Sequence, residues 1–257
     1  MRFHSGKDFL SWRDKRLAFI GMSGVGKSTL TNYLDLEQWA TFCTDFELAD
    51  GPLRPELEKF AGPDFPVGPN DISTLSAYVG KLGDPAQGGL DLGEFRRRQA
   101  LHEKAERQTF LNLIARLRSH QGPALIDSGG SLVEILEFDR PDPLRQSLCD
   151  QMFFIYIEAN EDQTHELIDR QLRAPKPMFY RADFLDQAIA DFGAPIDQAD
   201  PNDFIRHIFP RVIRARRPRY AALATEGGVA IPLEFTSQVR NKHQLLTLIA
   251  DHIDHAH

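Results

Sequence analysis

The chain has 257 residues, of which 42% are hydrophobic, and a formal net charge of −7 at pH 7. That length supports one α/β domain with a substantial core, and the negative charge excludes a general electrostatic attraction to nucleic acid. Two cysteines exclude a disulfide framework, and we find neither a signal peptide nor an apolar stretch of transmembrane length, so we expect a cytoplasmic protein with no nucleic-acid or membrane partner.

Residues 21–29 fit the phosphate-binding pattern G-x-x-x-x-G-K-[ST] at every fixed position. The apolar run 17–20 before them is expected to be a buried strand, and 29–34 is expected to continue as a helix. A strand, a loop and a helix in this order distinguish a phosphate-binding loop (P-loop) from a chance match. The alternative is a glycine-rich strand-to-helix turn with an exposed lysine.

The residue types in this loop suit Mg·ATP. Glycines let successive backbone N–H groups turn inward around an anion. Lys27 is expected to bridge the β- and γ-phosphates as a catalytic residue, and the Ser28 hydroxyl to bind Mg²⁺. The expected phosphate-binding residues are Gly21, Ser23, Gly24, Val25, Gly26, Lys27, Ser28 and Thr29.

The rest of the chain alternates strands with helices, which predicts a parallel sheet covered on both faces. Strands are expected at 39–43, 123–127, 152–157 and 229–233, the last at an edge because Pro232 has no N–H to donate. Helices are expected at 7–15, 93–119, 161–173, 182–192, 202–225 and 237–253, with interruptions at Pro210 and Pro218. The long helix 93–119 is expected to place Phe95, Leu111, Ile114 and Leu117 on its less polar positions.

Residues 51–92 differ in character because prolines and glycines interrupt them. Only short helices are expected there, at 53–60 and 72–79. Aromatic and aliphatic residues remain frequent, so we expect an ordered insert rather than a disordered one. We expect a single domain, 1–257, that contains an acceptor and lid region at 51–120.

Two aspartates end predicted strands, where ligands of open parallel sheets bind. Asp127 occupies the position of a Mg²⁺-linked aspartate, although it could also cap the next helix. Asp45 could contact a substrate hydroxyl, act as a base or hold a Mg²⁺ water, or be a solvated loop residue. Basic residues surround a proline-containing loop at 174–177, which is either a lid over a nucleotide or an ordinary turn.

The order of these features resembles the shikimate kinase group of small P-loop kinases. The matching pieces are Gly21–Thr29, Cys43-Thr44-Asp45, Phe95-Arg96, Asp127-Ser128-Gly129-Gly130, the strand Phe153–Ile157, Arg170, Lys176-Pro177-Met178, and Arg217-Pro218-Arg219-Tyr220 with Ala224. The resemblance implies a three-layer α/β P-loop NTPase fold, with a five-stranded parallel sheet in the order 2-3-1-4-5 and helices on both faces. It also implies roles: Asp45, Arg96, Gly129, Gly130 and Arg217 at the acceptor, Arg170 at adenine, and Arg173 or Lys176 as a lid cation, with Ser28 and Asp127 at the metal.

Over most of its length, including Ser76–Lys81, Gly83–Pro85 and Ala174–Tyr180, the chain more closely resembles an uncharacterised bacterial family of P-loop ATPases, and this resemblance implies no substrate. Gly130 follows Lys27 by 103 positions, tens of residues more than the shikimate kinase group typically has, which indicates an acceptor other than shikimate. We therefore predict a Mg·ATP-dependent phosphotransferase, with Asp45 and Arg173 as further catalytic residues and an unidentified small-molecule acceptor. The alternatives are a regulatory ATPase or nucleotide-dependent switch with a protein partner, and a nucleotide or polynucleotide kinase.

Overall fold

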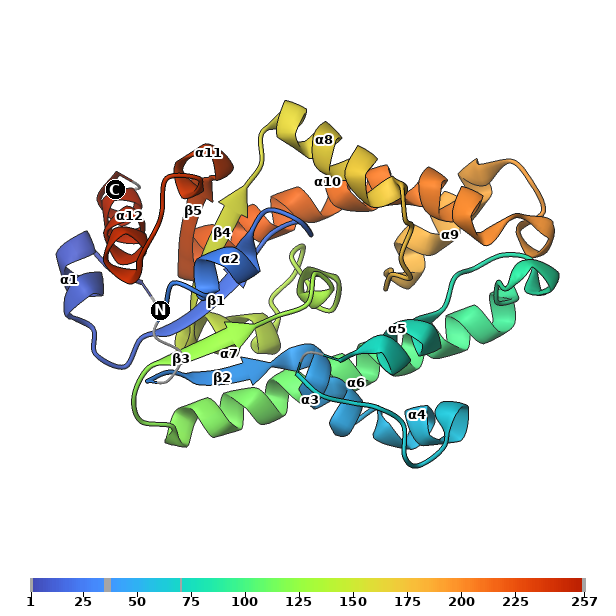
Figure 1. The fold of residues 1–257 in the computed structure, drawn as a ribbon, viewed down its shortest axis with the longest axis horizontal. Helices are drawn as coiled ribbons and strands as arrows, with labels where there is room; N and C mark the ends of the chain where they lie inside the picture. Colours follow the sequence, from blue (N-terminus) through green and yellow to red (C-terminus); the bar gives the residue numbers. More distant parts are fainter. Residues whose placement is uncertain (1, 35–37, 70, 256–257) are drawn as a thin grey trace. The chain divides into compact units, whose positions relative to one another are not determined.

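The computed structural model describes residues 2–34, 38–69 and 71–255 (Figure 1). Their contacts divide the chain into two compact units. The first, here called the sheet unit, comprises Met1–Cys43, Leu111–Leu167 and Arg217–His257; the second, the helical unit, comprises Thr44–Phe110 and Ile168–Arg216. Most of the expected insert at 51–120 falls in the helical unit, which also takes in 168–216.

The sheet unit contains five parallel strands in the order β2-β3-β1-β4-β5. They are β1 (Arg16–Ile20), β2 (Ala40–Cys43), β3 (Ala124–Asp127), β4 (Phe153–Glu158) and β5 (Gly228–Pro232). This confirms the predicted order 2-3-1-4-5 and the position of β5 at an edge. Because the strands are parallel, their carboxyl ends share one edge of the sheet, and the P-loop follows directly from β1.

Helices lie around this sheet (Figure 1). They are α1 (Gly6–Ser11), α2 (Lys27–Thr31), α7 (Pro143–Gln151), α11 (Leu233–Thr236) and α12 (Lys242–His255), with a short 3₁₀ helix at Leu132–Glu134. Helix α12 packs against β5 and α1. We had not predicted α7, although Asp142 caps it by accepting a 2.9 Å hydrogen bond from the Leu144 N–H, beside a proline in the first turn.

The helical unit is built from short helices around two apolar clusters. Its helices are α3 (Thr44–Asp50), α4 (Arg54–Ala61), α5 (Ser73–Val79) and α9 (Ala182–Phe192), with 3₁₀ helices at Pro85–Gln87 and Ile196–Gln198. One cluster includes Leu57 and Tyr78, and the other includes Phe95, Tyr180 and Phe204. These buried clusters explain why the proline- and glycine-rich stretch is ordered.

Three helices have residues in both units: α6 (Leu92–Ser119), α8 (Glu161–Leu172) and α10 (Pro201–Gly227). The predicted interruptions of α10 at Pro210 and Pro218 are wrong, because the helix is continuous through both. Proline removes one backbone donor, but buried side chains such as Ile208 and Val212 hold the flanking turns in helical geometry.

Other predictions were wrong in detail. Leu111 is 49% exposed, so it does not share the buried face of α6 with Phe95, Ile114 and Leu117. The helix after the P-loop ends at Thr31, and the last helix begins at Lys242 because the separate turn of α11 precedes it. Within the described ranges, none of the helices is both long and apolar enough to span a lipid bilayer.

Candidate functional site

The P-loop between β1 and α2 depends on glycines for two different physical reasons. Gly21 has φ = 135°, and a Cβ atom there would lie 2.8 Å from the Ile157 carbonyl oxygen on the neighbouring strand β4. Gly26 has φ = 87° but open space where a Cβ would be. Close packing against β4 and left-handed backbone geometry therefore both shape the loop.

Lys27 is the first residue of α2 and folds back over the loop. Its ammonium group donates hydrogen bonds to the carbonyl oxygens of Gly21 and Met22, each 2.9 Å long. Burial lowers the pKa of Lys27 to about 8, and the negative charge of Asp127 acts in the opposite direction. A cation held at the mouth of a glycine loop can exchange these carbonyl oxygens for the oxygens of a bound phosphate.

Asp127 lies beside this lysine at the carboxyl end of β3. In the sheet register it is opposite Phe19 of β1 and Cys43 of β2. Asp127 is exposed at the surface, but the surrounding protein partly desolvates its carboxyl group, and this desolvation raises the pKa. The positive charge of Lys27 acts in the opposite direction and lowers the pKa. The sheet unit thus brings the P-loop and Asp127 together.

These residues fit Mg²⁺ bound with a nucleotide. The Ser28 hydroxyl lies in the first turn of α2 and is exposed, and Asp127 supplies a carboxylate. The neighbouring Ser128 has a buried hydroxyl oxygen that finds no hydrogen-bond partner among the described residues. Mg²⁺ takes oxygen ligands, usually one or two carboxylates with waters and substrate phosphates. The described part of the chain holds no cluster of three His, Cys, Asp or Glu residues that could bind a metal alone.

Three further predicted residues also belong to the sheet unit. Gly129 and Gly130 follow Asp127 in the loop after β3. Arg217 donates a 3.2 Å hydrogen bond to the Ala159 carbonyl oxygen and forms an ion pair with Glu161. Both of these contacts of Arg217 are with the segment after β4, and its expected contact with the acceptor stays a prediction.

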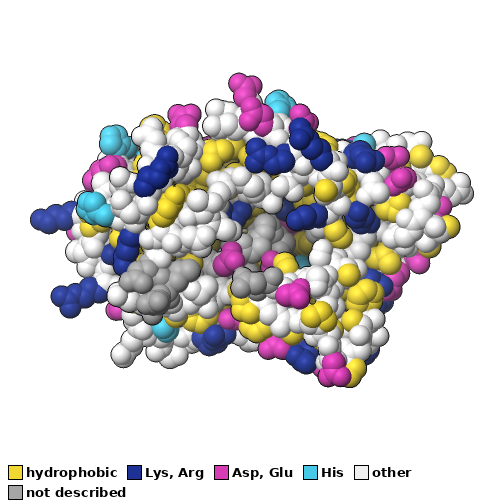
Figure 2. Space-filling model, in the orientation of Figure 1, with side chains coloured by type: hydrophobic (Ala, Val, Ile, Leu, Met, Phe, Trp, Pro, Cys, Tyr) yellow, Lys and Arg dark blue, Asp and Glu magenta, His cyan; other side chains and the backbone are white. Residues whose placement is uncertain are grey.

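The remaining predicted residues belong to the helical unit. Asp45 lies in the first turn of α3 rather than in a loop, because that helix begins directly after β2. Arg96 forms an exposed ion pair of 2.6 Å with Asp186. Figure 2 shows acidic and basic side chains mixed over the face in view, as such pairs require. Arg170, Arg173 and Lys176 are exposed. The roles expected for these residues stay predictions.

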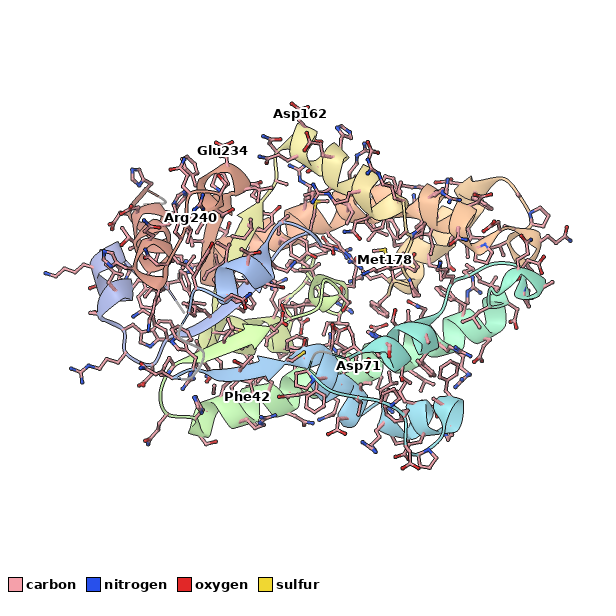
Figure 3. The ribbon with its side chains drawn as sticks, viewed as in Figure 1. Phe42, Asp71, Asp162, Met178, Glu234 and Arg240 are labelled. Carbon is pink, nitrogen blue, oxygen red and sulfur yellow. The ribbon has the colours of Figure 1, made fainter. Side chains whose placement is uncertain are left out.

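The proline-containing segment ends in an anchor that we had not predicted. The Gln99 side chain on α6 donates a 3.3 Å hydrogen bond to the Met178 carbonyl and accepts one of 2.8 Å from the Tyr180 N–H (Met178 is labelled in Figure 3). Arg216 donates a hydrogen bond of 2.9 Å to the Phe179 carbonyl between them. The available signal was a glutamine on the buried face of an otherwise charged helix.

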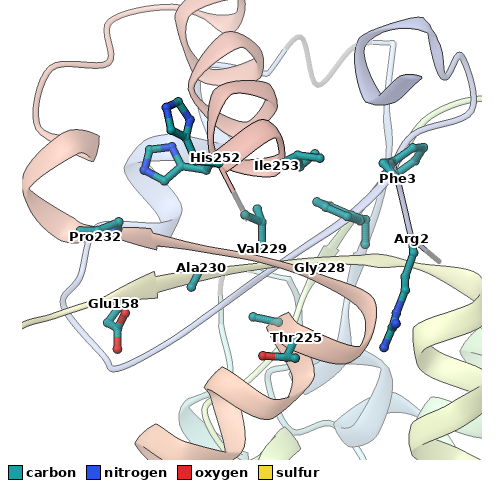
Figure 4. Close-up of a pocket in the computed structure, with 13 residues that line it drawn as sticks. Arg2, Phe3, Glu158, Thr225, Gly228, Val229, Ala230, Pro232, His252 and Ile253 are labelled. Atoms are coloured by element: carbon teal, nitrogen blue, oxygen red, sulfur yellow. The ribbon is translucent and has the colours of Figure 1, made fainter. Parts of the chain in front are cut away.

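The sheet unit also has a hollow of about 480 Å³ along β5, and none of the predicted site residues lines it (Figure 4). Gly228, Val229 and Ala230 of β5 line it, with His252 and Ile253 of α12 on one side. The candidate site consists of the P-loop, Asp127 and the loop after β3, and this hollow takes no part in it.

No protein-family model and no curated protein matches the chain. Similar solved structures include a shikimate kinase from Bacteroides thetaiotaomicron, which is 13% identical over 91% of this chain and 94% of that chain, with a TM-score of 0.44. A shikimate kinase from Acinetobacter baumannii in complex with shikimate is 15% identical over 96% and 93%, with a TM-score of 0.39. A Thermus thermophilus protein is 14% identical over 92% and 94%, with a TM-score of 0.41. The fold of this chain is defined by its own strand order, β2-β3-β1-β4-β5.

Proposed function

We propose that this chain is a Mg·ATP-dependent phosphotransferase that acts on a small polar molecule other than shikimate. The observation that carries the proposal is Lys27, held at the mouth of a glycine loop and close enough to Asp127 for each to shift the pKa of the other. Phosphoryl transfer needs positioning and charge stabilisation more than covalent chemistry from the protein. A glycine loop with a lysine beside a carboxylate is suited to that task.

In this proposal the loop amides and Lys27 bind the β- and γ-phosphates. The Ser28 hydroxyl and the Asp127 carboxylate would hold Mg²⁺, which when bound neutralises the charge that develops on the phosphates. Asp45 would position or deprotonate the acceptor hydroxyl. The other roles follow the resemblance, with Arg96, Gly129, Gly130 and Arg217 at the acceptor, Arg170 at adenine, and Arg173 or Lys176 as the lid cation.

Thermal unfolding with and without Mg·ATP tests the nucleotide site. A ligand at about 100 times its Kd stabilises a folded protein by about 2.7 kcal/mol, so the melting temperature should rise measurably. Lys27→Ala should remove most of this rise. Lys7→Ala, at an exposed lysine of α1, is the matched control and should keep it. An intact protein whose melting temperature ignores Mg·ATP would contradict the proposal.

Transfer of labelled γ-phosphate to a metabolite pool tests the second half of the proposal. A labelled small molecule that no longer forms with Asp45→Asn would support a kinase. Slow hydrolysis that no metabolite changes, but that a protein partner accelerates, would instead favour a regulatory ATPase. The two outcomes are distinguishable because both require nucleotide binding and only the first requires an acceptor.

A further inference from the structure

The loop that begins at Asp127 contains few side chains that could fix its shape. Gly129 and Gly130 have none, and Asp127 itself is exposed. The loop regains structure at the 3₁₀ helix Leu132–Glu134, where all three residues are buried. Since glycine has the largest conformational freedom to lose, contacts from elsewhere in the fold help to fix the stretch between Asp127 and this helix.

Two consecutive residues of α10 supply such contacts. The Tyr220 hydroxyl donates a 2.9 Å hydrogen bond to the Gly130 carbonyl oxygen. Arg219 forms a 2.8 Å ion pair with the Glu134 carboxylate, which is only 5% exposed. The first contact holds Gly130 and the second holds the 3₁₀ helix, so one turn of α10 holds the loop at two points.

The Tyr220 hydroxyl is itself held in place. Its ring is 2% exposed and stacks on Tyr156, with ring centroids 5.6 Å apart and an angle of 29° between the planes. Tyr156 lies on β4 opposite Ile20, the last residue of β1 before the P-loop. The Tyr220 hydroxyl is therefore a fixed donor to the loop after β3. Its position is set by β4, which pairs with β1, the strand that leads into the P-loop.

We propose that Tyr220, together with Arg219, is a positioning residue of the nucleotide site. By holding Gly130 and Glu134, the pair fixes the loop that starts at Asp127 and keeps the Asp127 carboxylate oriented toward the Mg²⁺ of a bound Mg·nucleotide. This inference rests on the proposed nucleotide binding and adds residues to the site that supports it. It predicts that the pair affects the metal-dependent part of nucleotide affinity and spares the part due to the P-loop.

Tyr220→Phe is the direct test, because it keeps the stacked ring and removes only the hydroxyl. Calorimetric titration should compare ATP with Mg²⁺ against ATP with EDTA. One hydrogen bond to a positioned group is worth roughly a fivefold change, so the Kd for Mg·ATP should rise by about that factor while the Kd for metal-free ATP stays unchanged. Tyr180→Phe is the matched control, since the buried Tyr180 hydroxyl has no hydrogen-bond partner in the described part of the chain, and both affinities should stay at wild-type values.

The possible outcomes separate this inference from the proposed function. If the wild-type protein does not bind ATP, or if Lys27→Ala binds ATP as well as the wild type does, both the proposed function and the positioning role are overturned. Mg²⁺-dependent binding that Tyr220→Phe leaves unchanged, or an equal loss with and without Mg²⁺, would overturn the positioning role alone. If Tyr220→Phe fails to fold, Arg219→Gln removes the second contact and should weaken Mg·ATP binding selectively. In that variant, unchanged Mg·ATP binding, or an equal loss of affinity with and without Mg²⁺, would also overturn the positioning role.

Discussion

The loops after β1 and β3 lie at the same edge of the sheet and both contain glycines, but they are held in different ways. In the P-loop, Lys27 donates to the carbonyls of Gly21 and Met22, six and five positions away, and Gly21 also packs closely against the Ile157 carbonyl of β4. The loop after β3 is held by Tyr220 and Arg219, which are 90 and 85 positions from the groups they bind. The hydrogen bonds of Lys27 in the first loop therefore lie within a short sequence motif, whereas those that Tyr220 and Arg219 make to the second loop join residues far apart in the sequence.

The same contrast extends to the helical unit. The segment that contains Met178 and Tyr180 pairs with no strand of the described residues, and the Gln99 side chain supplies it with one donor and one acceptor. Gln99 is 79 and 81 positions from the two residues that it binds. Loops held from a distance therefore depend on single side chains, and each of these is a place where the comparison can be tested.

The largest effect is expected from Gly21→Ala in the P-loop. The new methyl group would meet the Ile157 carbonyl at 2.8 Å, and φ = 135° is unfavourable for alanine, so we expect a loss of about 3 kcal/mol in unfolding free energy. Gly26→Ala is the matched variant, with the φ penalty but no clash, and should lose about 1 kcal/mol. Urea denaturation measures both. Equal losses would show that close packing on β4 does not shape the loop.

A smaller loss is expected from Gln99→Leu in the segment held from a distance. The substitution leaves the Met178 carbonyl and the buried Tyr180 N–H without their partner, which should cost about 2 kcal/mol of unfolding free energy. Lys104→Leu, at an exposed position of the same helix, should change stability by less than about 0.5 kcal/mol. Two variants of equal stability in urea would mean that the segment is held by its apolar side chains alone.

The pH dependence of nucleotide binding should separate the contribution of the Lys27 charge from that of the backbone amides of the P-loop, which do not titrate. The pKa of Lys27 is lowered to about 8 by burial, and phosphate oxygens would raise it, so binding takes up a proton above that pH. Affinity for Mg·ATP should be constant below pH 8 and fall by up to about tenfold per pH unit above it. Lys27→Arg keeps its charge, so its weaker binding should not vary between pH 7 and 9.5. A wild-type profile as flat as that of the arginine variant would refute this assignment.

Features that leave a local pattern in the sequence could be predicted, whereas features that depend on contacts between distant residues could not. Apolar runs or residue spacing within a few positions of sequence reveal all five strands, the P-loop and the helical pattern of 161–173 and 182–192. The continuity of α10 through Pro210 and Pro218 depends on packing against distant side chains, which local proline rules do not include. The role of Tyr220 was equally invisible, because nothing in its surrounding sequence identifies Gly130 as its partner.

The smallest effect is expected at Arg96, which belongs to neither kind of loop. Its ion pair with Asp186 joins side chains that are 53% and 59% exposed, and such pairs contribute about 0.5 kcal/mol or less. Arg96→Ala and Asp186→Ala should therefore differ little from wild type in urea denaturation. If Arg96 contacts the acceptor, γ-phosphate transfer to the metabolite pool should fall in Arg96→Ala and persist in Asp186→Ala. Transfer at the wild-type level in both variants would show that Arg96 does not contact the acceptor. The ion pair would then be an ordinary solvent-exposed pair that affects neither stability nor transfer.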